Sequence, residues 1–188
     1  MKSINATHYE LIPAFPSKDD RKNNVVHAIV ETTKGSPFKF ALDAKLGIIQ
    51  FSETMPEGYA WPYDYGFIPQ TLGGDGDPLD AVVMFERATF SGCLVKARLL
   101  GAIRLKKNGE ENDRFICAPQ RAAGVTQPTD GFDTLADLDG ATRRELETFL
   151  CGYSATQGNA IELVGAVEVD EARTLIDRGH KAFTRKRG

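Results

Sequence analysis

Residues 93–105, CLVKARLLGAIRL, constrain the fold more than any other segment, because side chains of different character alternate along its whole length. Lys96, Arg98 and Arg104 lie on the face opposite to the one that carries the alternate apolar side chains. This pattern predicts a long strand with one buried face. Gly101 in its interior allows the strand to bend, as a small barrel requires. We expect the cationic face to be solvated.

The rest of the chain divides into a region of strands followed by a region of helices. Runs rich in β-branched and aromatic residues predict strands at 25–32, 37–43, 46–51, 80–85 and 114–119, and Asn108-Gly109 predicts a hairpin turn before the last one. Helical spacing predicts a helix over 139–153, followed by a strand at 159–169 and a final helix capped by Asp170. These patterns predict a mainly β fold, a barrel core with flanking helices.

Composition favours one compact domain over residues 1–188. The chain is 41% hydrophobic, which is enough for a core without disulfides or structural metal. We expect an N-terminal extension at 1–24, a barrel core at 25–119, and a loop and C-terminal helices at 120–188. A net charge of -3 disfavours a nucleic-acid or membrane-surface partner.

Three cysteines without a zinc-ligand spacing predict reduced thiols. The sequence shows no secretion leader and no long apolar run, so we expect a cytoplasmic protein.

The segment TLGGDGDPLDAVVMF crowds Asp75, Asp77 and Asp80 within a few residues. Such charges repel unless a cation, a proton or open water relieves them. An EF-hand is excluded because Leu79 and Asp80 stand at its fifth and sixth positions, and because the flanks are strands. A solvated turn stays possible. The surrounding glycines and Pro78 favour convergent carboxylates that bind a hard divalent ion, most plausibly Mg²⁺.

Residues upstream of this loop could complete a site. WPYDYGFIPQT supplies aromatic bulk, and core packing is the simplest interpretation of Trp61 and Phe67. Glu31 ends one predicted strand and Lys39 lies in the next, so a carboxylate and an ammonium could face the acidic loop across a sheet. Each alone is more often a surface charge.

Taken together, these residues resemble the soluble, family I inorganic pyrophosphatases. DGDPLD at 75–80 matches the family's metal-binding signature, and YGFIPQT at 65–71 matches the segment that leads into it. ET…PFKFALD at 31–43 matches the strand pair that holds an acid and a phosphate-binding lysine. GAIRL matches the strand after the signature. The likeness extends from about residue 25 to the end of the chain.

The resemblance implies an OB-like five-stranded β-barrel, a homo-oligomer, and hydrolysis of pyrophosphate, or of a related small phosphate compound, by metal-activated water. Asp77 would be the base that orients the water. The other implied site residues are Asp75, Asp80 and Glu31 as metal ligands, and Lys39, Tyr65, Arg114 and Tyr153 as phosphate-binding residues.

Several positions depart from the family pattern. Ala41 replaces a glutamate, Glu53 an arginine, and Ser154 a lysine. Lys107 and Asn112 replace two aspartates in the hairpin after GAIRL, while Arg114 replaces a lysine and keeps a cation.

Two interpretations of these departures stay open. In the first, the chain is an active diphosphatase in which a hairpin acid (Glu110, Glu111 or Asp113) supplies a lost carboxylate, or in which the charge of Lys107 replaces a metal ion. In the second, it is a weakened or inactive homologue that binds a metal, another phosphorylated ligand or a protein partner. An OB-fold nucleic-acid binder is a weaker third hypothesis that rests on Lys96, Arg98 and Arg104.

Overall fold

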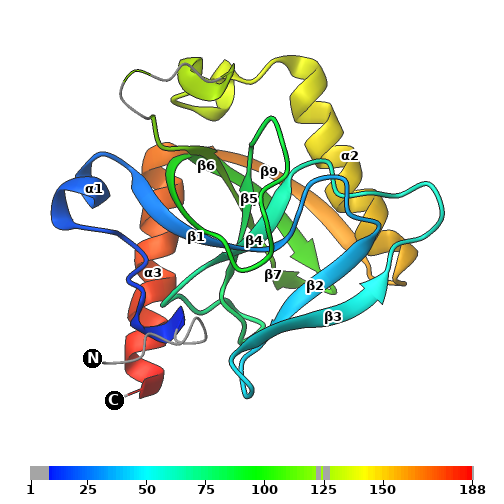
Figure 1. The fold of residues 1–188 in the computed structure, drawn as a ribbon, viewed down its shortest axis with the longest axis horizontal. Helices are drawn as coiled ribbons and strands as arrows, with labels where there is room; N and C mark the ends of the chain where they lie inside the picture. The colour runs from blue at the N-terminus through cyan, green and yellow to red at the C-terminus, as the bar shows by residue number, and fades with distance from the viewer. Residues whose placement is uncertain (1–8, 122–123, 125–127, 188) are drawn as a thin grey trace.

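The computed structural model describes residues 9–121, 124 and 128–187, and its centre is a closed β-barrel (Figure 1). The barrel strands, in order around it, are β1 (Val25–Thr32), β4 (Asp64–Ile68), β5 (Leu79–Val83), β8 (Arg114–Pro119) and β6 (Leu94–Lys107). β6 pairs with β1 and closes the barrel. β5 and β8 run parallel, and the other neighbours are antiparallel. The predicted barrel is confirmed.

The long strand β6 bends where the sequence predicts it. Its pairing with β8 shifts register between Leu99 and Gly101, which marks a bulge. Gly101 has a φ of 153°, and a Cβ there would lie 2.5 Å from the carbonyl oxygen of Val167. Only glycine fits this close approach.

Two further strands pair with β6 outside the barrel. β7 (Glu110–Glu111) pairs with its end through a turn in which Asn108 and Gly109 both have positive φ. Positive φ at both central residues is the geometry of a tight hairpin, as predicted. β9 (Ile161–Glu168) pairs with the second half of β6.

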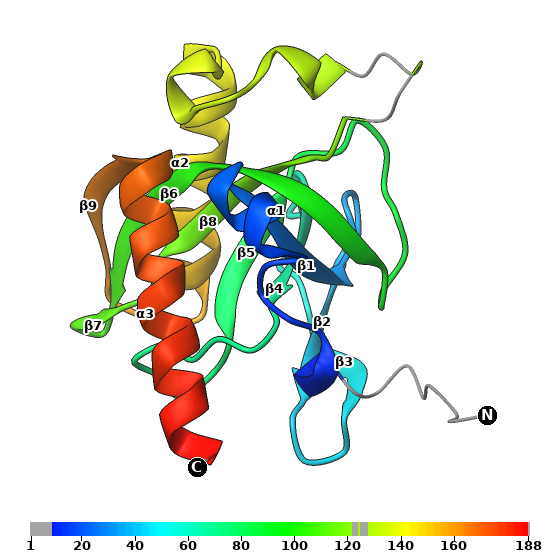
Figure 2. The ribbon, with the colours of Figure 1, turned by 90° about the vertical axis from the view of Figure 1, so that its left-hand side faces the viewer.

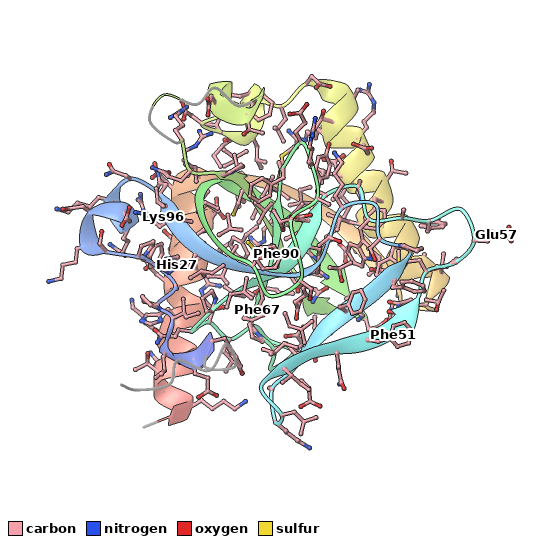
Figure 3. All side chains as sticks on the ribbon, in the orientation of Figure 1. His27, Phe51, Glu57, Phe67, Phe90 and Lys96 are labelled. Carbon is pink, nitrogen blue, oxygen red and sulfur yellow. The ribbon has the colours of Figure 1, made fainter. Side chains whose placement is uncertain are left out.

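The strands predicted at 37–43 and 46–51 form a separate hairpin. β2 (Phe38–Asp43) and β3 (Ile48–Thr54) pair with each other in a two-stranded sheet that stands apart from the barrel in both views (Figures 1 and 2). Phe51 is 57% exposed on this hairpin (Figure 3). The local pattern that predicts these strands does not specify their partners, because strand propensity depends on neighbours brought together by the fold.

Helices cover the outside of the barrel. They are α1 (Lys18–Lys22), α2 (Gly140–Thr156) and α3 (Val169–Arg187), with 3-10 turns at η1 (Tyr9–Leu11), η2 (Pro128–Gly131) and η3 (Leu135–Asp137). Asp139 caps α2 by accepting hydrogen bonds from the amides of Ala141 and Thr142. α3 packs on β6 (Figure 2). Ile176 on this helix is fully buried. The helix begins at Val169, so Asp170 lies in its first turn instead of capping it.

The cationic side chains of β6 are not simply solvated, which corrects the expectation. Arg98 is only 7% exposed and donates to the carbonyl oxygens of Thr129 and Pro119 as well as to Asp133. Each of the three cations has an acidic partner: Lys96 pairs with Asp20, Arg98 with Asp133, and Arg104 with Asp113. These contacts bind β6 to neighbouring segments.

All three cysteines are free thiols. Within the described part of the chain, no helix combines the length and hydropathy needed to cross a bilayer.

Candidate active site

One pocket of about 190 Å³ collects every residue that the sequence predicts for the site. Its walls come from the barrel, from β2 of the projecting hairpin and from α2. The predicted residues that line it are Glu31, Lys39, Tyr65, Asp75, Asp77, Asp80, Arg114 and Tyr153. The pocket therefore places carboxylates and cationic or phenolic donors on one surface.

Hydrogen bonds between side chains and the backbone order the acidic loop between β4 and β5. Thr71 donates its hydroxyl to the carbonyl of Ile68 (2.6 Å) and accepts the amide of Leu79 (2.9 Å). The amide of Asp77 donates to Asp75 Oδ1 at 3.1 Å. These bonds fix the base of the loop and hold the Asp75 side chain against the backbone of Asp77.

Cationic and amide groups within the chain contact these crowded acids. Arg114 Nη1 lies 2.6 Å from Asp80 Oδ2, and Arg114 also donates to the side-chain oxygen of Asn112 at 2.6 Å. Asn112 in turn donates to Asp75 Oδ2 at 3.1 Å. The contacts follow from the sheet, because Asp80 and Arg114 are register partners in the parallel pair β5–β8.

Burial raises the pKa values of Glu31, Asp77 and Asp80 in the pocket. It raises the pKa of Asp80, an effect that Arg114 opposes. Burial, followed by repulsion from Asp75, raises the pKa of Asp77. Burial raises the pKa of Glu31 to about 8, although its carboxylate accepts the amide of Leu42 at 2.7 Å. The pocket thus favours uptake of positive charge by these groups, as a proton or as a cation.

The donor chemistry fits a hard divalent cation. The three loop acids and Glu31 offer only oxygen atoms, which such ions prefer. Among the described residues, no group of three or more acids, histidines or cysteines is assembled closely enough to hold an ion. An ion that binds Asp80 Oδ2 or Asp75 Oδ2 competes with Arg114 or Asn112 for that oxygen.

Lys39 and Tyr153, two of the predicted phosphate-binding residues, both contact Glu53. Lys39 Nζ lies 3.4 Å from Glu53 Oε1, and the Tyr153 hydroxyl donates to the same oxygen at 2.5 Å. Tyr153 also packs against Trp61, with ring centroids 5.2 Å apart. Trp61 is 2% exposed and Phe67 is 3% exposed, so the core interpretation of both is confirmed.

Most positions that depart from the family pattern also face the pocket. Ala41, Lys107, Asn112 and Ser154 line it. The hairpin acids do not replace a lost ligand in the described residues: Glu111 and Asp113 bind Arg104 at 3.1 and 2.7 Å, and Glu110 is exposed at the hairpin edge. A shifted register is therefore not the source of a further carboxylate.

Sequence reasoning missed two contributions to the site. Gln157 lines the pocket and donates to both oxygens of Glu53 at 2.5 Å. Its position four residues after Tyr153, at the C-cap of α2, could have identified it. The second contribution comes from α3: the Leu72 amide donates to the carbonyl of Gly179 (3.1 Å), and His180 Nδ1 lies 2.8 Å from the carbonyl of Gln70. These contacts anchor the start of the acidic loop.

The barrel and this pocket define an OB-like barrel protein with a mixed acidic and basic ligand site. A family model described as inorganic pyrophosphatase matches residues 28–184. The inorganic pyrophosphatase of Synechocystis sp. is 30% identical over 92% of this chain and 96% of that protein, and the one of Streptomyces coelicolor is 34% identical over 82% and 93%. This chain belongs to the inorganic pyrophosphatase family, which confirms the resemblance seen in the sequence.

Solved structures agree with this assignment. The crystal structure of the inorganic pyrophosphatase from Thermus thermophilus matches with a TM-score of 0.82 at 25% identity, covering 94% of this chain and 98% of that one. The structure from Neisseria gonorrhoeae has the same fold, with a TM-score of 0.84 at 24% identity over 94% and 98% of the two chains.

Proposed function

We propose that this chain hydrolyses inorganic pyrophosphate to two phosphate ions with Mg²⁺ as its divalent metal cofactor. The observation that carries the proposal is the single pocket in which Asp75, Asp77 and Asp80 face Lys39 and Tyr153. Family membership supports the substrate and a divalent cofactor. Among divalent cations we choose Mg²⁺, because it binds carboxylate and phosphate oxygens.

Asp75, Asp80 and Glu31 would hold the metal, which when bound lowers the pKa of a water molecule and neutralises phosphate charge. Asp77 would accept the proton of the attacking water. A general base is most effective when its pKa lies near the working pH. Burial raises the pKa of Asp77 above the usual aspartate value, which brings it closer to neutral pH. The backbone N–H of Asp77 donates to Asp75 Oδ1, which fixes the main chain at this position, and Asp77 lines the pocket.

Lys39, Tyr65, Arg114 and Tyr153 would orient the phosphate groups. Lys39 and Arg114 supply positive charge to the pocket from two different strands, β2 and β8. The pKa of Tyr65 is raised well above its usual value, mainly by burial, so its phenol keeps the proton with which it donates a hydrogen bond. Releasing Asp80 from Arg114 would free that guanidinium for a phosphate oxygen.

Phosphate release from pyrophosphate, with and without Mg²⁺, tests this proposal. We expect release that depends on Mg²⁺ and that falls about 10²–10⁴-fold in Asp77→Asn, since this change removes the general base. Asp19→Asn is the matched control, because the Asp19 side chain is 87% exposed on α1 and should leave the rate unchanged. Wild-type release no faster than that of Asp77→Asn would refute the proposal. It would also support the inactive homologue, which family membership does not favour.

We further propose that residues 1–188 form one domain and that the protein is a cytoplasmic homo-oligomer. The family match over 28–184 supports a single unit, and the sequence resemblance supports the other two features. Light scattering of the purified chain would test the oligomer directly, and a monomer at micromolar concentration would refute it.

A further inference from the structure

Glu53 lies where a phosphate group would be expected to bind. It comes near the end of β3, directly opposite Lys39 in the register of the β2–β3 hairpin. Its carboxylate accepts the Tyr153 hydroxyl and the Gln157 amide, each at 2.5 Å, and lies 3.4 Å from Lys39 Nζ. Lys39, Tyr153 and Gln157 all line the pocket. The donors on this wall therefore already hold an anion that belongs to the chain.

The charge of Glu53 is stabilised by the same donors. Burial works to raise the pKa of Glu53, but the hydrogen bonds from Tyr153 and Gln157, together with Lys39, outweigh it and lower the pKa. The carboxylate is thus ionised at neutral pH. A second anion that approaches Lys39 meets both repulsion from Glu53 and donors that are already occupied.

We propose that Glu53 is an affinity-determining residue that competes with a phosphate group for Lys39, Tyr153 and Gln157. It weakens phosphate binding, because an incoming phosphate must displace the carboxylate or share its donors. The inference rests on the proposed function, because that proposal assigns Lys39 and Tyr153 to the phosphate site. If Glu53 only joined the hairpin to α2, its neutralisation would leave phosphate binding equal or weaker.

Calorimetric titration of the full chain with inorganic phosphate, in the presence of Mg²⁺, tests the inference. Glu53→Gln keeps the shape of the side chain and one acceptor oxygen but removes its charge. We expect the dissociation constant for phosphate to fall on the order of tenfold, from the loss of one charge a few ångströms from the ligand. Glu57→Gln is the matched control, because Glu57 is exposed in the loop after β3 (Figure 3) and should leave the constant unchanged.

Glu53→Asp is the second variant, in case Glu53→Gln does not fold. It keeps the charge but shortens the reach to Tyr153 and Gln157, so we expect a smaller gain in phosphate affinity. Equal or weaker phosphate binding in the folded variants would overturn the inference. Phosphate binding is measured without turnover, so the two proposals can fail separately. If Glu53→Gln binds phosphate more tightly but the wild-type chain releases no phosphate from pyrophosphate, only the hydrolysis is refuted. If the wild-type chain hydrolyses pyrophosphate but Glu53→Gln does not bind phosphate more tightly, only the role of Glu53 is refuted.

Discussion

The ion pair between Arg114 and Asp80 makes a specific prediction about stability. The Arg114 side chain is 10% exposed and that of Asp80 is 25% exposed, and their closest atoms lie 2.6 Å apart. Arg114→Met keeps most of the side-chain volume but leaves Asp80 without its cation. Removing one partner of a buried pair costs about 3–5 kcal/mol, and the partial exposure of Asp80 favours the lower end. For a chain of this size, 3 kcal/mol corresponds to a melting temperature lower by about 6–12 °C.

Thermal unfolding with increasing Mg²⁺ measures both the loss and its cause. Asp80 in Arg114→Met can gain a divalent cation without displacing an arginine, so Mg²⁺ should raise the melting temperature of the variant more than that of the wild type. Arg143→Met is the matched control, because Arg143 is 43% exposed and its pair with Glu147 is worth only about 0.5 kcal/mol. If both variants melt like the wild type, or if Mg²⁺ acts equally on all three proteins, the Arg114 pair does not compete with Mg²⁺ for Asp80 and the reasoning fails.

Three further predictions concern the core. Gly101→Ala should lower the free energy of unfolding, measured by urea titration, by at least about 2 kcal/mol. An added Cβ would lie 2.5 Å from the β9 backbone, and φ at this residue is 153°. Wild-type stability of the variant would show that the bulge can relax. Ile176→Ala should cost about 2–5 kcal/mol in the same assay, since it opens a cavity in a fully buried position between α3 and the barrel; a loss below that range would place α3 outside the core. Burial raises the pKa of Cys117 from 9.0 to about 12, so the folded state favours the neutral thiol. The free energy of unfolding should therefore decrease as pH rises from 9 toward 12, because the unfolded state loses this proton first. At pH 8 a thiol reagent should therefore modify Cys117 only after denaturation, and rapid modification of every cysteine in the native protein would contradict this.

The sequence predicts best those features that are written in short stretches of chain. Alternation in residues 93–105 identifies the long curved strand, and its glycine lies at the observed bulge. The acidic loop is likewise local, since its three aspartates fall within six residues. The start of the final helix differs by two residues, because it begins at Val169 and not after a cap at Asp170, and initial turns and caps are poorly separated by sequence.

Contacts between distant segments could not be predicted in the same way. The pair of Asp80 and Arg114 depends on the register of two parallel strands, which no local pattern specifies. Arg98 looks like a surface residue in its strand, and only the fold of the segment at 128–133 covers it. The bonds from α2 to Glu53 likewise require the hairpin to stand beside the helix.

Hydrolysis in isotopically labelled water tests the central claim most directly. In water enriched in ¹⁸O, attack of water at phosphorus breaks the P–O–P bridge and places one labelled oxygen in one of the two phosphate products. Mass spectrometry should find this label in phosphate produced by the wild-type chain with Mg²⁺, and should find almost none with Asp77→Asn over the same time. If the wild-type chain produces no labelled phosphate, or if both proteins produce it equally, then this chain does not hydrolyse pyrophosphate through Asp77.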